Sequence, residues 1–507
     1  MRITLLSVTA LFSLLLTGCA TPEEAAAVPG PSPDRLTYHF TPPDHWMNDP
    51  NGMVYHDGEY HLFYQHYPEG MVWGPMHWGH AVSTDMVHWE DLPIALYPDS
   101  LGMIFSGSAV DDRRNTSGLG TAENPPLVAV FTHHDMDGEK SGREDYQYQS
   151  LAYSTDRGRS WTKYAGNPVI PNPGIKNFRD PKVRWDDGSQ QWLLTLAAHD
   201  HIKIYASPNL IDWTFLSDFG RGIGAHVGVW ECPDLFPMTS REGDDHWVLL
   251  LSVDKGSPNG GSGTQYFVGR FDGEKFELDP SQSPQDSIWL DYGRDNYAGV
   301  SWADIPAADG RRIYMGWMNN WQYARQVPTP DRRGAMTLPR TLELRQTPRG
   351  MRLTSMPVRE TMELRTAEQP VSGDSAALAF AASTLELDLR FRLPADASEG
   401  RIYVRLTNGL GETYEVGYDA AERVFFSDRR RAGRIGFSPD FAKRVHTAPR
   451  ISTGTELDLR LWFDNQSAEL FADEGTIAMT DLFYPTEEFT EARVINEIPG
   501  ATFVSGT

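Results

Sequence analysis

Cysteine is almost absent from this chain: among 507 residues, Cys19 and Cys232 are the only two. Because Cys19 falls in the leader region described below, no internal disulfide framework is predicted and the fold must be stabilised by packing. Long apolar runs are also scarce. After the first 16 residues no segment stays apolar for the 18 residues that a membrane span needs, so no membrane-spanning helix is predicted in the body of the protein.

Basic residues are too few to balance the acidic ones. Lys and Arg number 45 against 69 Asp and Glu, a net charge of −24. This charge repels nucleic-acid phosphates and anionic membrane surfaces, which argues against a nucleic-acid partner. A hydrophobic content of 40% excludes global disorder and supplies large cores. The 45 Gly and 35 Pro residues interrupt long helices and favour many short strands, so an all-β protein of two or three domains is predicted.

The N-terminus has the pattern of an export signal. Arg2 precedes an apolar run over 3–16, and small residues follow. The segment from Leu16 to Cys19 resembles the lipobox of bacterial lipoproteins, which implies cleavage before Cys19 and lipidation of its thiol. We therefore predict a lipoprotein-type signal peptide (1–18), an Ala- and Pro-rich tether (19–34) and an exported protein anchored by lipid in the bacterial cell envelope. The alternative is a plain secreted protein whose Cys19 is removed with the leader.

A repeated module indicates a radial array of sheets. A Ser-rich turn that ends in Trp recurs at 83–89, 154–161 and 207–213, with a weaker copy at 269–276. A further unit around 295–321 brings the count to five. Repeats of this length accommodate four short strands each, which predicts a five-bladed β-propeller over 35–345.

The pattern changes after the propeller. Residues 385–391 and 457–463 alternate strictly between apolar and charged side chains, as half-buried antiparallel strands do. A β-sandwich is therefore predicted over 355–507. The run Arg429-Arg430-Arg431 is predicted to lie in a solvated hairpin loop.

Three acidic motifs occupy equivalent places in the repeat. Asp49 lies within 46–52, Asp180 follows Phe178-Arg179, and Glu231 lies within 230–234. Each precedes the aromatic marker of a different blade, and the first strand of a blade lines the channel of a propeller. We therefore expect the three acids to meet around one axis. Like charges held together are costly unless a proton or a cation is shared, which indicates a functional site.

The neighbours of these acids predict different protonation states. Arg179 beside Asp180 is expected to keep that carboxylate ionised, and the asparagine amides that frame Asp49 can donate hydrogen bonds to an anion. Glu231 lies between apolar neighbours, a setting that favours the protonated form. One proton donor beside ionised carboxylates is the requirement of glycoside hydrolysis.

Aromatic side chains near these motifs suit a sugar ligand, because an indole offers a flat apolar face and one donor. These are Trp46, Trp73, Trp78, Trp230, Trp317 and Trp321. A metal site at His199 and His201 has no third ligand, so no metal is predicted. The glycine-rich segments 222–228 and 256–263 match neither nucleotide-binding motif.

The motifs together resemble glycoside hydrolase family 32, the invertases, exo-inulinases, levanases and related fructan-processing enzymes. The resemblance covers nearly the whole mature chain and rests on the order and spacing of residues 46–52, 78–81, 105–109, 179–181 and 230–234. It implies that Asp49 is the nucleophile that attacks C2 of a fructosyl unit, that Glu231 protonates the leaving oxygen and that Asp180 stabilises the transition state. It implies no cofactor. The residues implied to line the subsite for the terminal fructose are Asn48, Gln65, Trp73, Phe105, Ser106, Arg179 and Trp317.

The predicted activity is that of a retaining, exo-acting β-fructosidase that releases terminal fructose from levan or inulin, with sucrose as a further substrate. Endo-acting inulinases of this family tend to carry Glu where this chain has Asp49, so the aspartate favours exo action. Three alternatives stay open: an endo-acting fructanase, an inverting arabinan- or xylan-acting hydrolase with the same number of blades, and a non-catalytic surface propeller that only binds glycans. Linkage preference lies in loops beyond the first subsite and is not predicted.

Overall fold

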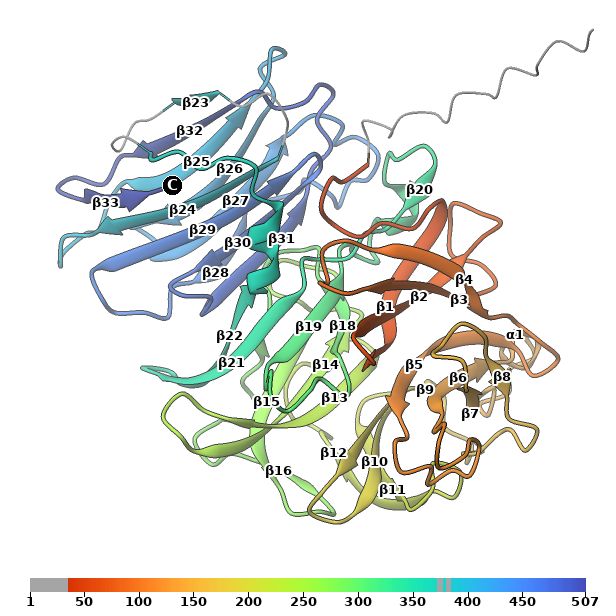
Figure 1. Ribbon diagram of the computed structural model, residues 1–507. Coiled ribbons are helices and arrows are strands. Elements are labelled where there is room, and N and C mark those ends of the chain that lie inside the picture. The colour runs from red at the N-terminus through yellow and green to blue at the C-terminus, as the bar shows by residue number, and fades with distance from the viewer. Residues whose placement is uncertain (1–34, 372–376, 380–383) are drawn as a thin grey trace, which may run out of the picture. The chain divides into compact units, whose positions relative to one another are not determined.

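The computed structural model describes residues 35–371, 377–379 and 384–507. The predicted signal peptide (1–18) and tether (19–34), with Cys19, lie outside these residues. Strands dominate the fold (Figure 1). Helices within the described residues are short: α1 (Met136–Lys140), η1 (Ala324–Gln326) and η2 (Arg359–Leu364). In this part of the chain no helix has the length and apolar character needed to cross a membrane.

The N-terminal sheets are antiparallel blades that follow one another along the chain. The first blade consists of β1 (His45–His56), β2 (Glu59–Tyr67), β3 (His77–Ser83) and β4 (Glu90–Leu96). The second consists of β5 (Met103–Asp111), β6 (Leu127–His134), β7 (Gln147–Ser154) and β8 (Thr162–Lys163). The third consists of β9 (Phe178–Asp186), β10 (Gln191–Ala198), β11 (Ile202–Ser207) and β12 (Thr214–Phe219).

Short strands are added to the fourth blade and to the first. The fourth consists of β13 (Trp230–Thr239), β14 (Asp245–Val253), β15 (Gly263–Phe271) and β16 (Phe276–Leu278), with β17 (Ile288–Trp289) paired to β15. The fifth consists of β18 (Tyr297–Ser301), β19 (Arg312–Trp317), β21 (Arg340–Thr347) and β22 (Gly350–Pro357). Between β19 and β21 the chain returns to the first blade, where β20 (Arg332–Arg333) pairs in parallel with β1.

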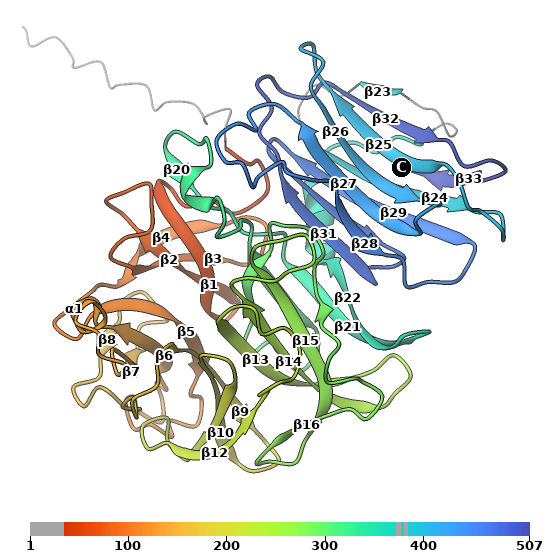
Figure 2. The same cartoon turned by 180° about the vertical axis from the view of Figure 1, so that it is seen from behind.

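The first strands of the blades form a closed ring. β1 contacts β5, β5 contacts β9, β9 contacts β13, β13 contacts β18, and β18 contacts β1. The blades extend outward from this ring (Figure 2). The predicted five-bladed propeller is thus confirmed.

The Ser-Trp repeat is the turn before the outermost strand of a blade. In the first copy, Ser83 Oγ accepts from the backbone N–H of Met86 (2.7 Å), and Asp85 Oδ1 accepts from that of Val87 (2.9 Å). These side-chain acceptors stabilise the turn. In the second copy, Trp161 reaches the neighbouring blade, with its ring centroid 5.5 Å from that of Phe63. The repeat therefore seals adjacent blades together.

The expected propeller boundary at residue 345 falls inside a hairpin. β21 pairs with β19 and with β22, and Leu342 and Leu353 of this hairpin are buried in the core between the fourth and fifth blades. The fifth blade therefore continues to Pro357, and 355–357 belong to it rather than to the C-terminal domain. The propeller therefore ends at Pro357, the last residue of β22.

The C-terminal domain consists of two antiparallel sheets. One contains, in spatial order, β23 (Ala377–Ala379), β32 (Glu491–Asn496), β25 (Arg401–Thr407), β26 (Thr413–Asp419), β27 (Val424–Arg431) and β28 (His446–Pro449). The other contains β31 (Ile477–Leu482), β30 (Ser467–Ala472), β29 (Glu456–Asp464), β24 (Leu385–Arg392) and β33 (Thr502–Gly506). Leu387, Leu389 and Phe391 alternate into one shared core, which confirms the predicted sandwich.

Arg429 contradicts the expectation of a solvated loop. It lies in β27 and is fully buried. Its guanidinium donates to Asp295 Oδ2 of the propeller (2.6 Å) and to the carbonyl oxygens of Phe441 and Leu482. Arg430 and Arg431 are exposed, as predicted, but they are the last residues of this strand and do not lie in a loop. A run of charged residues does not reveal this burial, because strand alternation turns one of the three arginines inward to an acid that is remote in sequence.

Candidate active site

A register shift occurs at the same place in the first strand of every blade. In each case two residues of the first strand face one residue of the second: Asn48 and Asp49, Phe105 and Ser106, Asp180 and Pro181, Cys232 and Pro233, Ala298 and Gly299. Such a bulge interrupts the ladder and redirects a side chain. Asp180 and Cys232 have left-handed backbone with φ of 64° and 49°. The ring of bulges brings the predicted site residues of different blades together.

Asp49 is held by two uncharged donors. Ser106 Oγ donates to Oδ2 (2.7 Å), and Asn48 Nδ2 donates to Oδ1 (2.9 Å). Trp46 Nε1 in turn donates to Asn48 Oδ1 (2.7 Å) and orients the amide. Burial and the nearby charge of Glu231 raise the pKa of Asp49, whereas these two hydrogen bonds lower it. The carboxylate is therefore oriented without a direct cationic partner.

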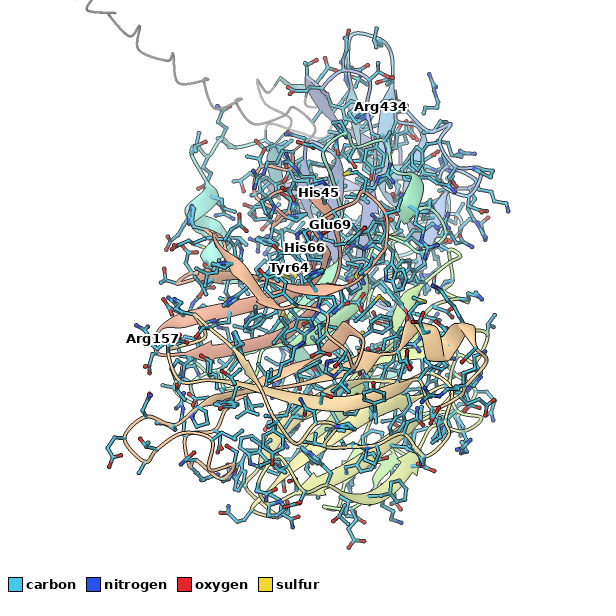
Figure 3. The ribbon with its side chains drawn as sticks, turned by 90° about the vertical axis from the view of Figure 1, so that its right-hand side faces the viewer. His45, Tyr64, His66, Glu69, Arg157 and Arg434 are labelled. Carbon is cyan, nitrogen blue, oxygen red and sulfur yellow. The ribbon has the colours of Figure 1, made fainter. Side chains whose placement is uncertain are left out.

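A residue of β2 holds the backbone of β1 just before Asp49. The Nδ1–H of His66 donates to the carbonyl oxygen of Trp46 (2.9 Å), and the ring of Tyr64 lies 5.7 Å from that of His66. Figure 3 labels these side chains together with His45, the first residue of β1. Burial lowers the pKa of His66, which favours the neutral ring. This contact fixes β1 immediately before its bulge.

The pKa of Asp180 differs from the sequence prediction, which was an ionised carboxylate with an ordinary low pKa. Its exposure is only 5%, and burial raises its pKa to about 7; Arg179 opposes this rise, while the charges of Glu231 and Asp49 add to it. The nearest approach of the Arg179 guanidinium to Asp180 is 3.9 Å. Arg179, the neighbour in sequence, therefore does not hold the pKa of this carboxyl group in its ordinary low range. Its closest donor is the backbone N–H of Cys232 (3.1 Å).

Glu231 has polar partners, not the apolar surroundings that were predicted. Arg179 donates to Oε1 through Nη2 (2.7 Å) and Nε (3.1 Å), and the hydroxyl of Tyr297 donates to Oε2. Trp230 is fully buried, and its Nε1 donates to the carbonyl of Ala225 (2.8 Å). The apolar neighbours in the sequence thus pack into the blade, and the carboxyl group meets groups from two other blades.

The thiol of Cys232 joins the two aspartates. Its Sγ lies 3.8 Å from Asp49 Oδ2 and 3.7 Å from Asp180 Oδ2. Burial and the surrounding carboxylates raise the pKa of this thiol. Cys232 is therefore a neutral, weak donor between two acids, which come from the first and third blades.

The other predicted residues have distinct surroundings. Gln65 lies opposite the bulge at Asp49, and its Nε2 is buried without a hydrogen-bond partner among the described residues; the same is true of Nε1 of Trp317. Trp73 and Phe105 are half-buried, with ring centroids 5.9 Å apart at 80°. Phe105 also stacks on His134 at 4.3 Å. Buried donors and aromatic faces therefore flank the carboxylates.

Sequence reasoning missed Tyr297, Asn177 and Gln147. Tyr297 opens the fifth blade, so the argument that located the acids by their place in the repeat would have located it too. Asn177 Oδ1 and Gln147 Oε1 accept from Arg179 Nη1 at 2.8 and 3.4 Å. These two contacts complete the set of acceptors around the guanidinium, and no local motif indicates them.

No metal site is evident in the part of the chain that the structure describes: no group of three His, Cys, Asp or Glu side chains is placed to hold an ion. The two histidines considered above have other partners. His199 Nδ1 lies 3.1 Å from Asn177 Nδ2, and His201 interacts with Asp200 and Arg221.

Carboxyl groups gathered from several blades, with aromatic rings and free donors beside them, define the class of this protein as a glycoside hydrolase. Comparison with known families specifies the class further. Residues 39–357 match the glycosyl hydrolases family 32 N-terminal domain, and residues 353–506 match the family 32 C-terminal domain. The chain belongs to glycosyl hydrolase family 32.

Relatives share most of the chain. A levanase from Bacillus subtilis is 47% identical over 96% of this chain and 71% of its own length. An extracellular exo-inulinase from Aspergillus niger is 38% identical over 95% of both chains. The crystal structure of exo-inulinase from Aspergillus awamori has a TM-score of 0.85 and 36% identity, and covers 94% of this chain and 98% of that one. The structure of fructofuranosidase from Schwanniomyces occidentalis complexed with fructose has a TM-score of 0.81 and 30% identity. It covers 93% of this chain and 97% of that one.

Proposed function

We propose that this protein is an exo-acting, retaining β-fructosidase that releases terminal fructose from levan or inulin and also cleaves sucrose. The observation that carries the proposal is that three carboxyl groups from three blades meet at one place: Cys232 Sγ lies 3.8 Å from Asp49 Oδ2 and 3.7 Å from Asp180 Oδ2, and Arg179, next to Asp180, donates to Glu231 Oε1 at 2.7 Å. Similarity to a levanase, to exo-inulinases and to a fructose-bound fructofuranosidase supports the fructosyl substrate.

In this proposal Asp49 is the nucleophile. Its carboxylate attacks C2 of the terminal fructosyl unit, and the bond from C2 to the leaving oxygen breaks as Glu231 donates a proton to that oxygen. A fructosyl ester of Asp49 forms. Water then transfers a proton to Glu231 and attacks C2, which releases fructose and restores both carboxyl groups. Neutral donors at Asp49 suit this role, because they orient the carboxylate while an ion-paired cation would lower its nucleophilicity.

Asp180 is proposed to bind fructose hydroxyls and to stabilise the developing positive charge. Asn48, Gln65, Trp73, Phe105, Ser106, Arg179 and Trp317 are proposed to line the same subsite. The unpartnered donors of Gln65 and Trp317 support this assignment, because a buried donor without an acceptor is costly and a sugar hydroxyl would satisfy it. The rings of Trp73 and Phe105 offer apolar faces to the sugar carbons.

The test is a time course on levan, inulin and sucrose, with product anomers followed by NMR before mutarotation. Free fructose from the first time point, released as the β-anomer, is the expected result. Oligosaccharides that appear before fructose would favour an endo-acting enzyme. An α-anomer as first product would exclude the double displacement. Polymer binding without any turnover would favour the glycan-binding propeller.

Export with a lipid anchor at Cys19 is part of the proposal. The extracellular assignment in the names of the exo-inulinases supports export, and the lipobox-like segment supports the anchor. The test is labelling with radioactive palmitate in a bacterial host, compared with the Cys19→Ser variant. Label on the wild type and none on the variant is expected; an unlabelled wild type found in the medium would overturn the anchor.

A further inference from the structure

His134 lies at the centre of a group of buried contacts in the second blade. It is the last residue of β6 and pairs with Met103 of β5 on one side and with Gln147, the first residue of β7, on the other. Its exposure is only 3%. The three strands are neighbours in this blade (Figure 1). The proposed function gives this histidine no role.

The ring of His134 supports an aromatic wall. It stacks on Phe105, with centroids 4.3 Å apart and planes at 11°, and Phe105 in turn meets Trp73 edge to face at 5.9 Å. Phe105 and Trp73 are the half-buried rings proposed to face the sugar carbons. Because aromatic pairs favour defined relative geometries, the buried His134 ring fixes the plane of its exposed partner.

A hydrogen-bond chain connects the same ring to Arg179. A guanidinium can only donate, so Gln147 Oε1 accepts from Arg179 Nη1 (3.4 Å) and the amide Nε2 is left to donate to His134 Nδ1 (3.0 Å). This order of donors requires a neutral imidazole with a lone pair on Nδ1. Burial and the charge of Arg179 lower the pKa of His134 to about 4, which keeps the ring in this neutral form at neutral pH.

A second acceptor of Arg179 leads back to the same histidine. Nη1 also donates to Asn177 Oδ1 (2.8 Å), and the hydroxyl of Tyr146 donates to that oxygen (3.4 Å). The Tyr146 ring packs edge-on against His134, with centroids 5.3 Å apart at 75°. These two acceptors hold one end of the guanidinium, while Nη2 and Nε at its other end donate to Glu231.

We propose that His134 is a positioning residue for the reaction: its ring fixes Phe105 beside the sugar, and its Nδ1 fixes Arg179 and, through it, Glu231. The inference rests on the proposed function, because that function gives these three residues their roles. It adds that two effects come from different parts of one side chain. The stacked ring acts on substrate binding, and the Nδ1 acceptor acts on proton transfer to the leaving oxygen.

Two substitutions separate the ring from the acceptor. His134→Phe keeps a stacked ring and removes Nδ1, so kcat on sucrose is expected to fall about 10-fold with KM nearly unchanged. His134→Asn keeps an acceptor, because Oδ1 of Asn and Nδ1 of His are both bonded to Cγ, but it removes the ring. For His134→Asn we expect KM to rise about 3- to 10-fold while kcat stays within about 2-fold of the wild-type value. A purely structural role would lower stability in both variants without this division.

His133→Phe and His133→Asn are the matched controls. His133 is the preceding residue of β6, is also buried and has its Nδ1 2.7 Å from Ser150 Oγ, but strand alternation turns it to the opposite face of the sheet. These variants are expected to lose stability without a change in kcat or KM. Thermal unfolding midpoints identify a variant that has lost its fold. If the His134 variants do not fold, Gln147→Leu, which breaks the same chain and leaves the ring in place, is expected to lower kcat alone.

Initial rates on sucrose, levan and inulin decide the outcome. The proposal is overturned if the wild type is active and the His134 variants keep its kcat and KM, or if both variants change kcat and KM by the same factors. A kcat as low in His134→Asn as in His134→Phe overturns the role of Nδ1. If the wild type releases no fructose from any of the three substrates, the proposed function fails and this inference fails with it, a result distinct from those above.

Discussion

The guanidinium of Arg179 pairs with Glu231 of the next blade rather than with Asp180, its neighbour in sequence. Nη2 lies 2.7 Å from Glu231 Oε1, against 3.9 Å for the nearest approach to Asp180. One acid is thus ion-paired, and another, almost fully buried, has a pKa raised to about 7. The three carboxyl groups therefore have three different environments, which is what a division of catalytic labour requires.

Asp49→Asn and Glu231→Gln are each expected to lower kcat by about 10³-fold or more, with substrate binding retained. A fructoside with an activated aryl leaving group, which departs without protonation, distinguishes the two variants. Glu231→Gln should recover much of its rate of fructosyl transfer on that substrate, and Asp49→Asn should not. Burst kinetics measure this difference. Near-normal turnover by either variant would remove its assigned role.

Asp180→Asn is expected to inactivate the enzyme and to stabilise the fold. The pKa of Asp180 is raised from an ordinary value of 3.8 to about 7, so its ionisation costs folding free energy as the pH rises through this range. At pH 8 the neutral amide should increase the free energy of unfolding by up to about 4 kcal/mol, with no gain below pH 4. Urea titrations at both pH values measure the effect. A variant less stable than wild type at pH 8 would contradict the inference that burial raises the pKa of the Asp180 carboxyl group.

Tyr297→Phe is expected to lower kcat about 10-fold with little change in KM, because its hydroxyl orients the Glu231 carboxyl group while the sugar subsite stays intact. Tyr266→Phe is the matched control: this buried tyrosine on β15 bonds only the backbone N–H of Leu353 among the described contacts. Its removal should lower stability without lowering kcat. An equal fall of kcat and rise of KM in Tyr297→Phe would indicate a role in substrate binding instead.

Gln65→Leu is expected to raise the stability of the free enzyme by about 1 kcal/mol, because an unsatisfied buried amide is replaced by an apolar group. The same change should lower kcat/KM at least about 10-fold if the amide bonds a fructose hydroxyl. Gln149→Leu provides the contrast, since the amide of Gln149 is fully bonded to Thr132 and to the carbonyl of Phe178. That variant should lose stability.

His39 links the propeller to the sandwich and makes stability depend on pH. Burial alone would lower its pKa, but hydrogen bonds to Asp464 (2.8 Å) and Glu469 (2.7 Å) raise it to about 9. Because the folded pKa exceeds the unfolded value of 6.5, this contribution is complete below pH 6.5 and is lost as the pH rises through 9. His39→Gln should remove about 3 kcal/mol at pH 6 and little at pH 9.5.

The control for His39 is His61, whose pKa burial lowers to about 4. The folded ring is neutral throughout the range, but the unfolded ring, with a pKa of 6.5, is partly protonated at pH 6, so His61→Gln should cost about 1 kcal/mol less at pH 6 than at pH 9.5, the opposite trend to His39→Gln. Chemical denaturation across this range measures both variants. A pH-independent effect of His39→Gln would show that its ring is neutral in the folded protein.

The sequence by itself determined the repeat, and with it the number of blades, because each blade needs a turn and a sealing aromatic that leave a local signature. It determined the sandwich through strict alternation. It also placed the motifs of Asp49, Asp180 and Glu231 at the openings of three blades, although their catalytic roles stay a prediction. Each of these inferences concerns residues that are neighbours along one strand or turn.

Only the tertiary structure decided which group each side chain meets. Closure of the ring brings Tyr297 of the fifth blade to Glu231 and turns Arg179 away from Asp180. Packing against the sandwich buries Arg429 on Asp295. The register shift in each first strand directs these side chains, and it depends on pairing with the second strand. Contacts between blades depend on how the sheets close into a ring and pack. No local sequence pattern specifies which remote residue a side chain will meet.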